Sequence, residues 1–280
     1  MSDTFERSCE HWSEAGRAEM EAFYALASVD YRHLAEALDW KAWLQARQEQ
    51  AGSRPLRLLD VACGSGKFPS ALVRYADVAS APIQPVDYAL LDPAEFSVAE
   101  ARSALAAPFV AGEGFVTTLQ GLDCAPAAFD IVWATHALYA LPAEELQAGL
   151  ERFIEATADI GFIAHASADA HYLRFYRHYL EAFRDGQGTP YTTAEQIIAA
   201  LEQMGARFET LEINYTNGAP TAQRQQIEGY LQRCVFDDSI SLQQMLDHPI
   251  TGDYLATCQH DGEWRFAQRV QLIFLHPKRP

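Results

Sequence analysis

The sequence contains no stretch of about 18 consecutive apolar residues, the length that a membrane-spanning helix requires. Its first residues, MSDTFERSCEHWSEAG, lack the apolar core of a secretory signal. Basic residues are also scarce: 21 Lys and Arg stand against 38 Asp and Glu, a formal net charge of −17. Because affinity for nucleic acid and for anionic lipid comes mainly from Lys and Arg, we expect neither nucleic acid nor a membrane as partner.

Cysteine pairs and metal-ligand patterns are missing as well. The five cysteines (positions 9, 63, 124, 234 and 258) are odd in number and scattered, with no C-x-x-C, and the nine histidines are dispersed. This pattern excludes a disulfide scaffold and is typical of a reducing cytoplasm, so we expect a cytoplasmic protein without a metal site. With 49% hydrophobic and 11% aromatic residues, the chain has enough apolar residues to form a large core. The classes of protein that remain are an acidic globular enzyme and a small-molecule binder.

Short apolar runs alternate with helical patterns through the middle of the chain. Runs typical of buried strands occur at residues 56–61, 86–92, 115–119, 129–134 and 160–166. Helical patterns separate them at residues 69–75, 94–106 and 143–156. This alternation predicts an α/β fold, with a mostly parallel sheet covered by helices on both faces.

The two ends of the chain differ from this middle part. Residues 1–52 have helical patterns, including a face that Asp30 would cap, and we expect them to form an N-terminal helical cap on a domain spanning residues 53–280. A helix at 194–204, with Thr192 and Thr193 as candidate N-caps, precedes two final strands, and we place these strands at residues 207–215 and 269–275. About fifty residues of mixed helix and loop separate the two strands, and connections of such length are usually functional.

The most informative segment is LLDVACGSGKF, residues 58–68, in which a buried strand runs into a glycine turn and a helix. Glycines let the backbone approach a ligand, and the first turn of the helix offers free N–H donors, so a nucleotide-like cofactor would bind above the end of the strand. A dinucleotide fingerprint needs a third glycine and a P-loop needs G-x-x-x-x-G-K-[ST]; both are absent. An ordinary strand–turn–helix corner is the alternative interpretation.

Four residues of this turn, Asp60, Ala62, Gly64 and Gly66, form the pattern D-x-A-x-G-x-G. The pattern resembles motif I of the class I S-adenosylmethionine-dependent methyltransferases, a family that usually has glycine where this chain has Ala62. The resemblance implies a Rossmann-like fold, with a mostly parallel seven-stranded sheet and an antiparallel last strand. It also implies S-adenosylmethionine as cofactor and S-adenosylhomocysteine as product.

Three later segments extend the resemblance in the expected order: ALLDP at 89–93, QGLD at 120–123 and FDIVWATHALYAL at 129–141. The resemblance implies cofactor contacts from Asp92 and Pro93 at the ribose, Leu122 and Asp123 at the adenine, and Ala134 and Thr135 near the methyl donor. A carboxylate suits a ribose diol because it offers acceptors on two oxygens. Asp92 is alternatively the N-cap of the following helix.

The acceptor of the methyl group would lie beyond the fourth strand. We expect His136, Tyr139 and Tyr31 to contact it, since histidine titrates near neutral pH and transfer requires alignment of the acceptor with the methyl group. His136 is alternatively a positioning or structural residue, and Tyr139 a core residue. The aromatic stripe of HYLRFYRHYLEAF, residues 171–183, is either core or a cage for a cationic or aromatic substrate. Residues 217–262 form a helical insertion that either covers the acceptor site or packs outside it.

A looser resemblance concerns the segment THALYAL at 135–141 and the order of elements in the tail, which are similar to those of histamine N-methyltransferase-type enzymes. This resemblance favours a small-molecule acceptor (an amine, phenol or carboxylate, methylated by in-line displacement) and a monomer or homodimer. The ATHA sequence after the fourth strand does not resemble the NPPY-type motif of nucleic-acid amino-methylating enzymes. The alternatives are a non-catalytic S-adenosylmethionine-binding protein and a nucleotide-dependent oxidoreductase, which the missing third glycine disfavours.

Overall fold

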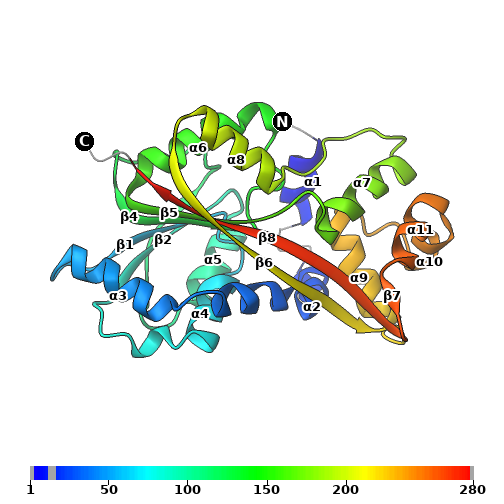
Figure 1. Ribbon diagram of the computed structural model, residues 1–280, viewed down its shortest axis with the longest axis horizontal. Helices are drawn as coiled ribbons and strands as arrows, with labels where there is room; N and C mark the ends of the chain where they lie inside the picture. Colours follow the sequence, from blue (N-terminus) through cyan, green and yellow to red (C-terminus); the bar gives the residue numbers. More distant parts are fainter. Residues whose placement is uncertain (1–2, 12–16, 278–280) are drawn as a thin grey trace.

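The protein is described by a computed structural model that covers residues 3–11 and 17–277 (Figure 1). Within these residues the strands form one 8-stranded sheet, with the order β3-β2-β1-β4-β5-β8-β6 and β7 paired to β8. The strands are β1 (Arg57–Val61), β2 (Val86–Asp92), β3 (Phe109–Val116), β4 (Phe129–Thr135), β5 (Thr157–Ala166), β6 (Arg207–Pro220), β7 (Gln259–His260) and β8 (Glu263–His276). Strands β1 to β5 pair in parallel, and β8 is antiparallel to both β5 and β6. The predicted mostly parallel sheet with an antiparallel last strand is confirmed.

Helices cover both faces of the sheet, because successive residues of the central strands point in opposite directions. Leu58 of β1 packs toward α3 (Trp40–Ala51), α4 (Lys67–Tyr75) and α5 (Glu95–Ala104). Leu59, the next residue, packs toward α6 (Ala143–Ala156) and α8 (Ala194–Gln203) on the other face. Leu34, near the C-terminal end of α2 (Arg17–Glu36), packs in the same layer as α3, α4 and α5. The N-terminal part of α2 extends beyond the sheet (Figure 1). A short 3₁₀ turn, Val78–Ser80, follows α4.

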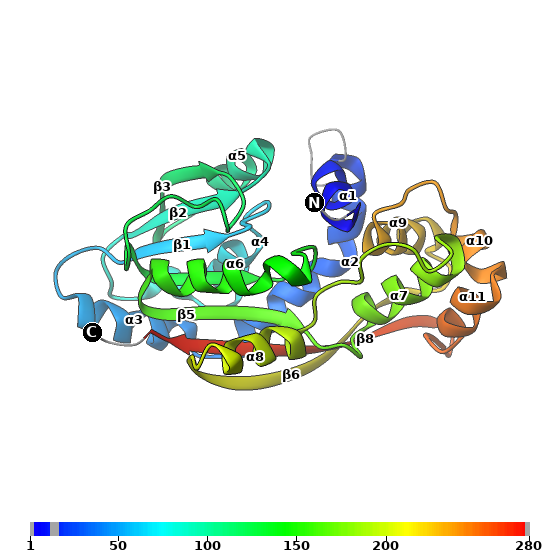
Figure 2. The same ribbon diagram turned by 90° about the horizontal axis from the view of Figure 1, so that it is seen from above.

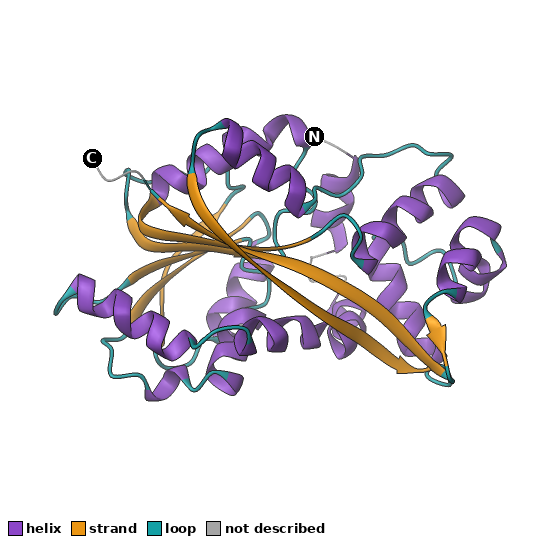
Figure 3. Cartoon of the chain, in the orientation of Figure 1, coloured by secondary structure: helices purple, strands orange, loops and turns teal. Residues whose placement is uncertain are grey.

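Strands β6 and β8 are longer than predicted and extend past the rest of the sheet as a two-stranded arm (Figure 3). The arm carries α9 (Arg224–Val235), α10 (Leu242–Asp247) and α11 (Pro249–Ala256), so the insertion spans residues 221–262 and not 217–262. Together with α7 (His171–Phe183), these helices enclose a second core, which contains Tyr172, Tyr230 and Phe266. Helix α1 (Asp3–His11) lies between this helical end of the molecule and the sheet (Figure 2).

Two local predictions are wrong and a third is confirmed. Asp30 lies inside α2 and does not cap a helix, because the helix already begins at Arg17. The third strand is residues 109–116 and not 115–119; Thr118 instead begins a turn in which its carbonyl accepts a hydrogen bond from the amide of Gly121. Thr193 does cap α8, where it forms a reciprocal capping box with Gln196.

No helix in the described part of the chain is long and apolar enough to span a membrane.

Candidate functional site

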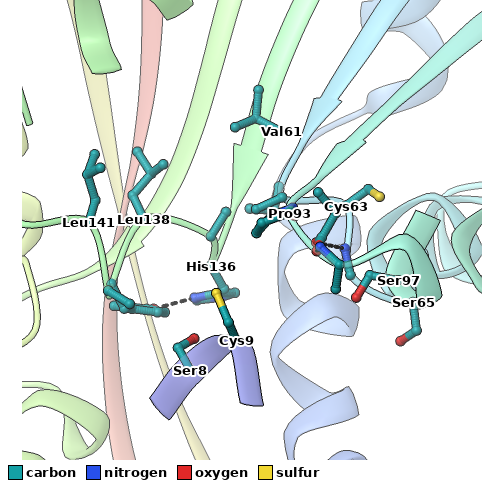
Figure 4. Close-up of a pocket in the computed structure, with 18 of the residues that line it drawn as sticks. Ser8, Cys9, Val61, Cys63, Ser65, Pro93, Ser97, His136, Leu138 and Leu141 are labelled. Atoms are coloured by element: carbon teal, nitrogen blue, oxygen red, sulfur yellow. Dashed lines mark hydrogen bonds between the residues drawn. The ribbon is translucent and has the colours of Figure 1, made fainter. Parts of the chain in front are cut away.

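A cavity of about 220 Å³ lies at the carboxyl ends of β1, β2 and β4. Strand β1 is the point where the chain order reverses: β2 and β3 lie on one side of it and β4 and β5 on the other. Ligands of open α/β sheets bind at such a reversal, where the loops after neighbouring strands separate. These loops form the floor of the cavity, and residues of α1, α2 and α9 form the opposite wall. Figure 4 shows Ser8 and Cys9 of α1 in this wall.

The turn after β1 forms the floor of the cavity. Asp60, Ala62 and Gly64 line it, whereas Gly66 does not. Burial raises the pKa of Asp60 to about 7, and its carboxylate accepts a hydrogen bond from the Tyr88 hydroxyl at 2.7 Å. Ala62 has a φ of 51°, a left-handed conformation that costs an alanine about 1 kcal/mol and explains why glycine is usual there.

The two glycines of the turn have different roles. A Cβ atom on Gly64 would meet only the Tyr24 hydroxyl, 3.9 Å away, so this side of the backbone faces open space. A Cβ atom on Gly66 would lie 3.2 Å from both the Cα of Ala101 and the Cβ of Ala104 in α5. Gly64 therefore leaves room for a ligand, and Gly66 permits the close packing of α4 against α5.

Asp92, at the end of β2, links two loops of the floor. Its Oδ2 accepts a hydrogen bond from the backbone amide of Gly64 at 3.1 Å, and its Oδ1 accepts one from the amide of Ala94 at 2.9 Å. The residue is 7% exposed and lines the cavity beside Pro93, and desolvation raises its pKa despite these bonds. A carboxylate has about four lone-pair directions, so Asp92 keeps acceptor capacity for a ligand.

The connection after β3 contributes Thr118, Leu119 and Gln120 to the cavity. The predicted adenine contacts, Leu122 and Asp123, do not line it: Leu122 is buried against α6 and Asp123 is exposed. The carbonyl of Leu122 accepts a hydrogen bond from Arg152 Nε at 2.6 Å, which turns the chain away from the cavity.

The end of β4 supplies the predicted acceptor-contacting residues. His136 and Tyr139 both line the cavity. Of the two cofactor contacts predicted at the end of β4, Thr135 lines the cavity, whereas Ala134 is fully buried and does not. His136 Nδ1 lies 2.6 Å from the Tyr139 hydroxyl, while its buried Nε2 has no hydrogen-bond partner among the described residues. Desolvation lowers the pKa of His136 to about 3, so its ring is neutral at pH 7.

Tyr31 approaches this pair from α2. Its ring lies edge-on to the ring of His136, with 5.9 Å between the ring centres. Tyr139 in turn packs on His165, with 4.2 Å between centres. The three predicted acceptor-contacting residues therefore meet in one aromatic group, and burial raises the pKa values of both tyrosines.

Several wall residues were not predicted from the sequence. They are Phe5, Ser8 and Cys9 of α1 and Asp30 of α2. Arg233, Cys234 and Phe236, in and after α9, also line the cavity, and they belong to the insertion that we expected either to cover the acceptor site or to pack outside it. Helix α1 is held over the cavity by hydrogen bonds from Arg7 to the hydroxyls of Tyr176 and Tyr179. No periodicity within α1 or α9 could have indicated that they face the glycine turn, since the contact is between distant segments.

Of the aromatic stripe at 171–183, Tyr172 lines the cavity, and Phe175 and Tyr179 belong to the second core. Among the described residues, no group of three or more His, Cys, Asp or Glu side chains could hold a metal ion.

Solved structures with a similar fold identify the fold of this chain. No family model and no curated protein matches the sequence. Magnesium protoporphyrin IX methyltransferase from Synechocystis, with bound S-adenosylhomocysteine, has a similar structure: the TM-score is 0.55 over 97% of this chain and 99% of that chain, at 13% identity. The same enzyme with bound S-adenosylmethionine gives 0.51 over 98% of both chains, at 12% identity.

The YcgJ protein of Bacillus subtilis gives a TM-score of 0.54 over 86% of this chain and 98% of that chain, at 13% identity. This chain has the class I methyltransferase fold. The Rossmann-like fold that the motif pattern implied is thereby confirmed, including the antiparallel strand β8 between β5 and β6.

Proposed function

We propose that the protein is an S-adenosylmethionine-dependent methyltransferase that acts on a small-molecule acceptor. The observation that carries this proposal is the joining of two regions in one cavity. The Gly64 turn and Asp92 form one region, and the aromatic group around His136 forms the other. A cofactor and an acceptor bound there would be adjacent and enclosed by α1, α2 and α9, which favours transfer between them.

The residues of the floor suit S-adenosylmethionine. Asp92 would accept hydrogen bonds from the ribose hydroxyls, which would offset the desolvation that raises the pKa of its carboxyl. The open side of Gly64 and the hydroxyl of Tyr24 would bound the methionine portion, and Thr118, Leu119 and Gln120 would bound the base. When bound, the sulfonium supplies a methyl group whose bond to sulfur breaks with the electron pair passing to sulfur.

His136 and Tyr139 would position the acceptor. A histidine whose pKa is lowered to about 3 is a weak base at neutral pH, so its expected role is to orient a neighbouring group by hydrogen bonding. The unpartnered Nε2 atom is available for the acceptor, and Nδ1 is held by Tyr139. This favours the positioning role over the proton-transfer role that the sequence left open.

The insertion at 221–262 would contribute to the choice of acceptor, because Arg233, Cys234 and Phe236 form part of the cavity wall. Its other large residues, Tyr230, Met245 and Tyr254, fill the second core and support this wall from behind. We also propose a cytoplasmic location; the five cysteines are free in the structure, as in a reducing compartment.

A non-catalytic binder of the same cofactor would require no space beside the methyl group. The cavity instead continues from the glycine turn to Tyr139 and Tyr172, which favours an enzyme. The test is a screen of amines, phenols and carboxylic acids in which release of S-adenosylhomocysteine is followed. Acceptor-dependent release supports the proposal; binding of S-adenosylmethionine without release by any acceptor class would favour the binder.

A further inference from the structure

Asp30 is a charged group in the cavity wall that the proposed reaction has not yet used. It belongs to α2, one residue before Tyr31, and is 3% exposed. Its Oδ1 accepts a hydrogen bond from Asn217 Nδ2 at 2.8 Å, and its Oδ2 accepts one from the Tyr172 hydroxyl. Tyr215 is a third polar neighbour of this carboxylate.

Both hydrogen-bond partners and the neighbouring Tyr215 are neutral groups. Among the described residues, Asp30 has no ion pair, although the cavity wall also contains Lys67 and Arg233. Lys67 lies over the ring of Tyr24, with 4.5 Å from Nζ to the ring centre, and Arg233 Nη1 donates to the carbonyl of His11. The charge of Asp30 is therefore compensated only by neutral donors.

A buried carboxylate with only neutral partners is costly to the fold. Desolvation raises the pKa of Asp30 to about 6, despite the hydrogen bonds that it accepts. An asparagine could accept a hydrogen bond from Asn217 through its Oδ1 and donate one from its Nδ2 to the Tyr172 hydroxyl, at a lower desolvation cost, so holding these two side chains does not require a carboxylate. A cationic ligand in the cavity would supply the missing compensation.

Aromatic rings surround this part of the cavity. Phe23 lies 5.4 Å from Tyr24 and 6.1 Å from Tyr172, measured between ring centres, and Tyr24 lies 6.4 Å from Tyr31. The faces of such rings attract cations, most strongly where water is excluded. The same wall thus combines a carboxylate with the ring type that binds ammonium groups.

We propose that the methyl acceptor is a protonated amine, whose ammonium group binds between the carboxylate of Asp30 and the rings of Tyr24, Tyr31 and Tyr172. This inference rests on the proposed methyltransferase function and narrows its acceptor from amines, phenols and carboxylates to amines. His136 is neutral and therefore does not repel the cation.

The carboxylate of Asp30 would also accept the proton that the ammonium has to lose before it can be methylated. An ammonium has no lone pair, so it first gives one proton to Asp30. The freed nitrogen lone pair then forms the bond to the methyl carbon, while the carbon–sulfur pair passes to sulfur. The products are a methylated ammonium, S-adenosylhomocysteine and one proton, which leaves Asp30 for solvent when the product departs. A carboxyl whose pKa is raised to about 6 is a better proton acceptor than an ordinary aspartate.

The test is calorimetric binding to the full chain loaded with S-adenosylhomocysteine, which requires no turnover. The probes are amines of increasing size, each paired with its alcohol isostere: ethylamine with ethanol, hexylamine with hexanol, and 2-phenylethylamine with 2-phenylethanol. We expect at least one amine to bind about tenfold or more tightly than its alcohol, the effect of one charge-assisted hydrogen bond. Asp30→Asn should reduce this ratio to near one while binding S-adenosylhomocysteine as the wild type does.

Asp39→Asn is the matched control. Asp39 is an exposed carboxylate outside the cavity that caps α3, and asparagine caps a helix equally well, so the amine preference should stay unchanged. If no amine binds more tightly than its alcohol to the loaded wild-type protein, the amine inference is overturned and the methyltransferase proposal stands. If the wild type fails to bind S-adenosylhomocysteine, the proposed function itself is overturned. Should Asp30→Asn not fold, the wild-type amine and alcohol pairs still decide the outcome.

Discussion

The Nδ1 atom of His136 lies 2.6 Å from the hydroxyl of Tyr139, across the first turn of chain after β4. His136 has a φ of 54°, and its backbone amide donates to the carbonyl of Ala164 in β5, so the strand end and the side chain are fixed together. A left-handed backbone at a non-glycine residue is strained, and such strain is common where a side chain has to point in one direction.

Replacing His136 tests the positioning role. His136→Asn keeps a residue type that tolerates the left-handed conformation but removes the ring. We expect kcat/KM for the acceptor to fall by about ten- to a hundredfold, the value of one or two buried hydrogen bonds, with affinity for S-adenosylhomocysteine unchanged. Tyr139→Phe should give a smaller loss in the same parameter. An equal loss of cofactor affinity would place His136 at the cofactor instead.

Asp92 and Asp123 form a natural pair for testing cofactor binding. Asp92→Ala should weaken binding of S-adenosylmethionine by about 1.5–3 kcal/mol, as expected for a hydrogen bond to a charged group. Asp123→Ala should leave the affinity unchanged, because Asp123 is exposed and does not line the cavity. Titration calorimetry measures the affinity of both variants for S-adenosylmethionine. Equal affinities of the two variants would show that Asp92 does not contact the cofactor.

Substitution of Gly64 should affect cofactor binding, whereas substitution of Gly66 should affect stability. Gly64→Val places a side chain in the open space before Tyr24 and should abolish cofactor binding. Gly66→Val brings a side chain against Ala101 and Ala104 and should mainly lower the melting temperature. Thermal unfolding and cofactor titration of both variants separate the effects. A Gly64→Val protein with normal affinity would show that the cofactor does not approach this turn.

Ionisation of Asp130 should make the stability of the fold depend on pH between about 4 and 2. Burial opposes its ionisation, but hydrogen bonds from Arg54 and Arg57 outweigh this and lower its pKa to about 2, from 3.8 in the unfolded chain. The ionised carboxylate therefore stabilises the fold above about pH 4, and this contribution is lost as the pH falls toward 2. Asp130→Asn should lower the free energy of unfolding at pH 7 by about 1–2 kcal/mol, reduced by exposure of the arginines.

Urea unfolding of wild type and Asp130→Asn at several pH values checks this prediction. The difference between the two proteins should shrink as the pH is lowered from 4 toward 2, because Asp130 becomes protonated in the wild type while the other carboxyls titrate in both proteins and cancel. A difference that is independent of pH would assign the effect to packing.

Most of the parallel sheet and the Gly64–Asp92 part of the floor could be predicted from the sequence, because both depend on local patterns. Helices α6 and α7 occupy the predicted residues 143–156 and 171–183, and Gly64 and Asp92 lie together as the motif order indicated. The C-terminal end of β6 was not predictable, because NGAP at 217–220 has the composition of a turn although it pairs with β8.

Part of the opposite wall was not predictable for another reason. Asp30 has the residue type of a helix cap, and only the tertiary contacts with Tyr172 and Asn217 reveal that it is buried within α2. No local pattern indicated that Cys9 of α1 reaches the cavity either. Phe236, which belongs to the insertion expected over the acceptor site, meets Cys9 there because of the length of the β6–β8 arm.

Titration of the purified chain with S-adenosylhomocysteine shows whether the cavity at the ends of β1 and β2 binds S-adenosylmethionine. We expect saturable binding of one molecule per chain, competition by S-adenosylmethionine, and no comparable binding of NAD or ATP. Absence of S-adenosylhomocysteine binding, or its displacement by a dinucleotide at the same site, would exclude this cofactor.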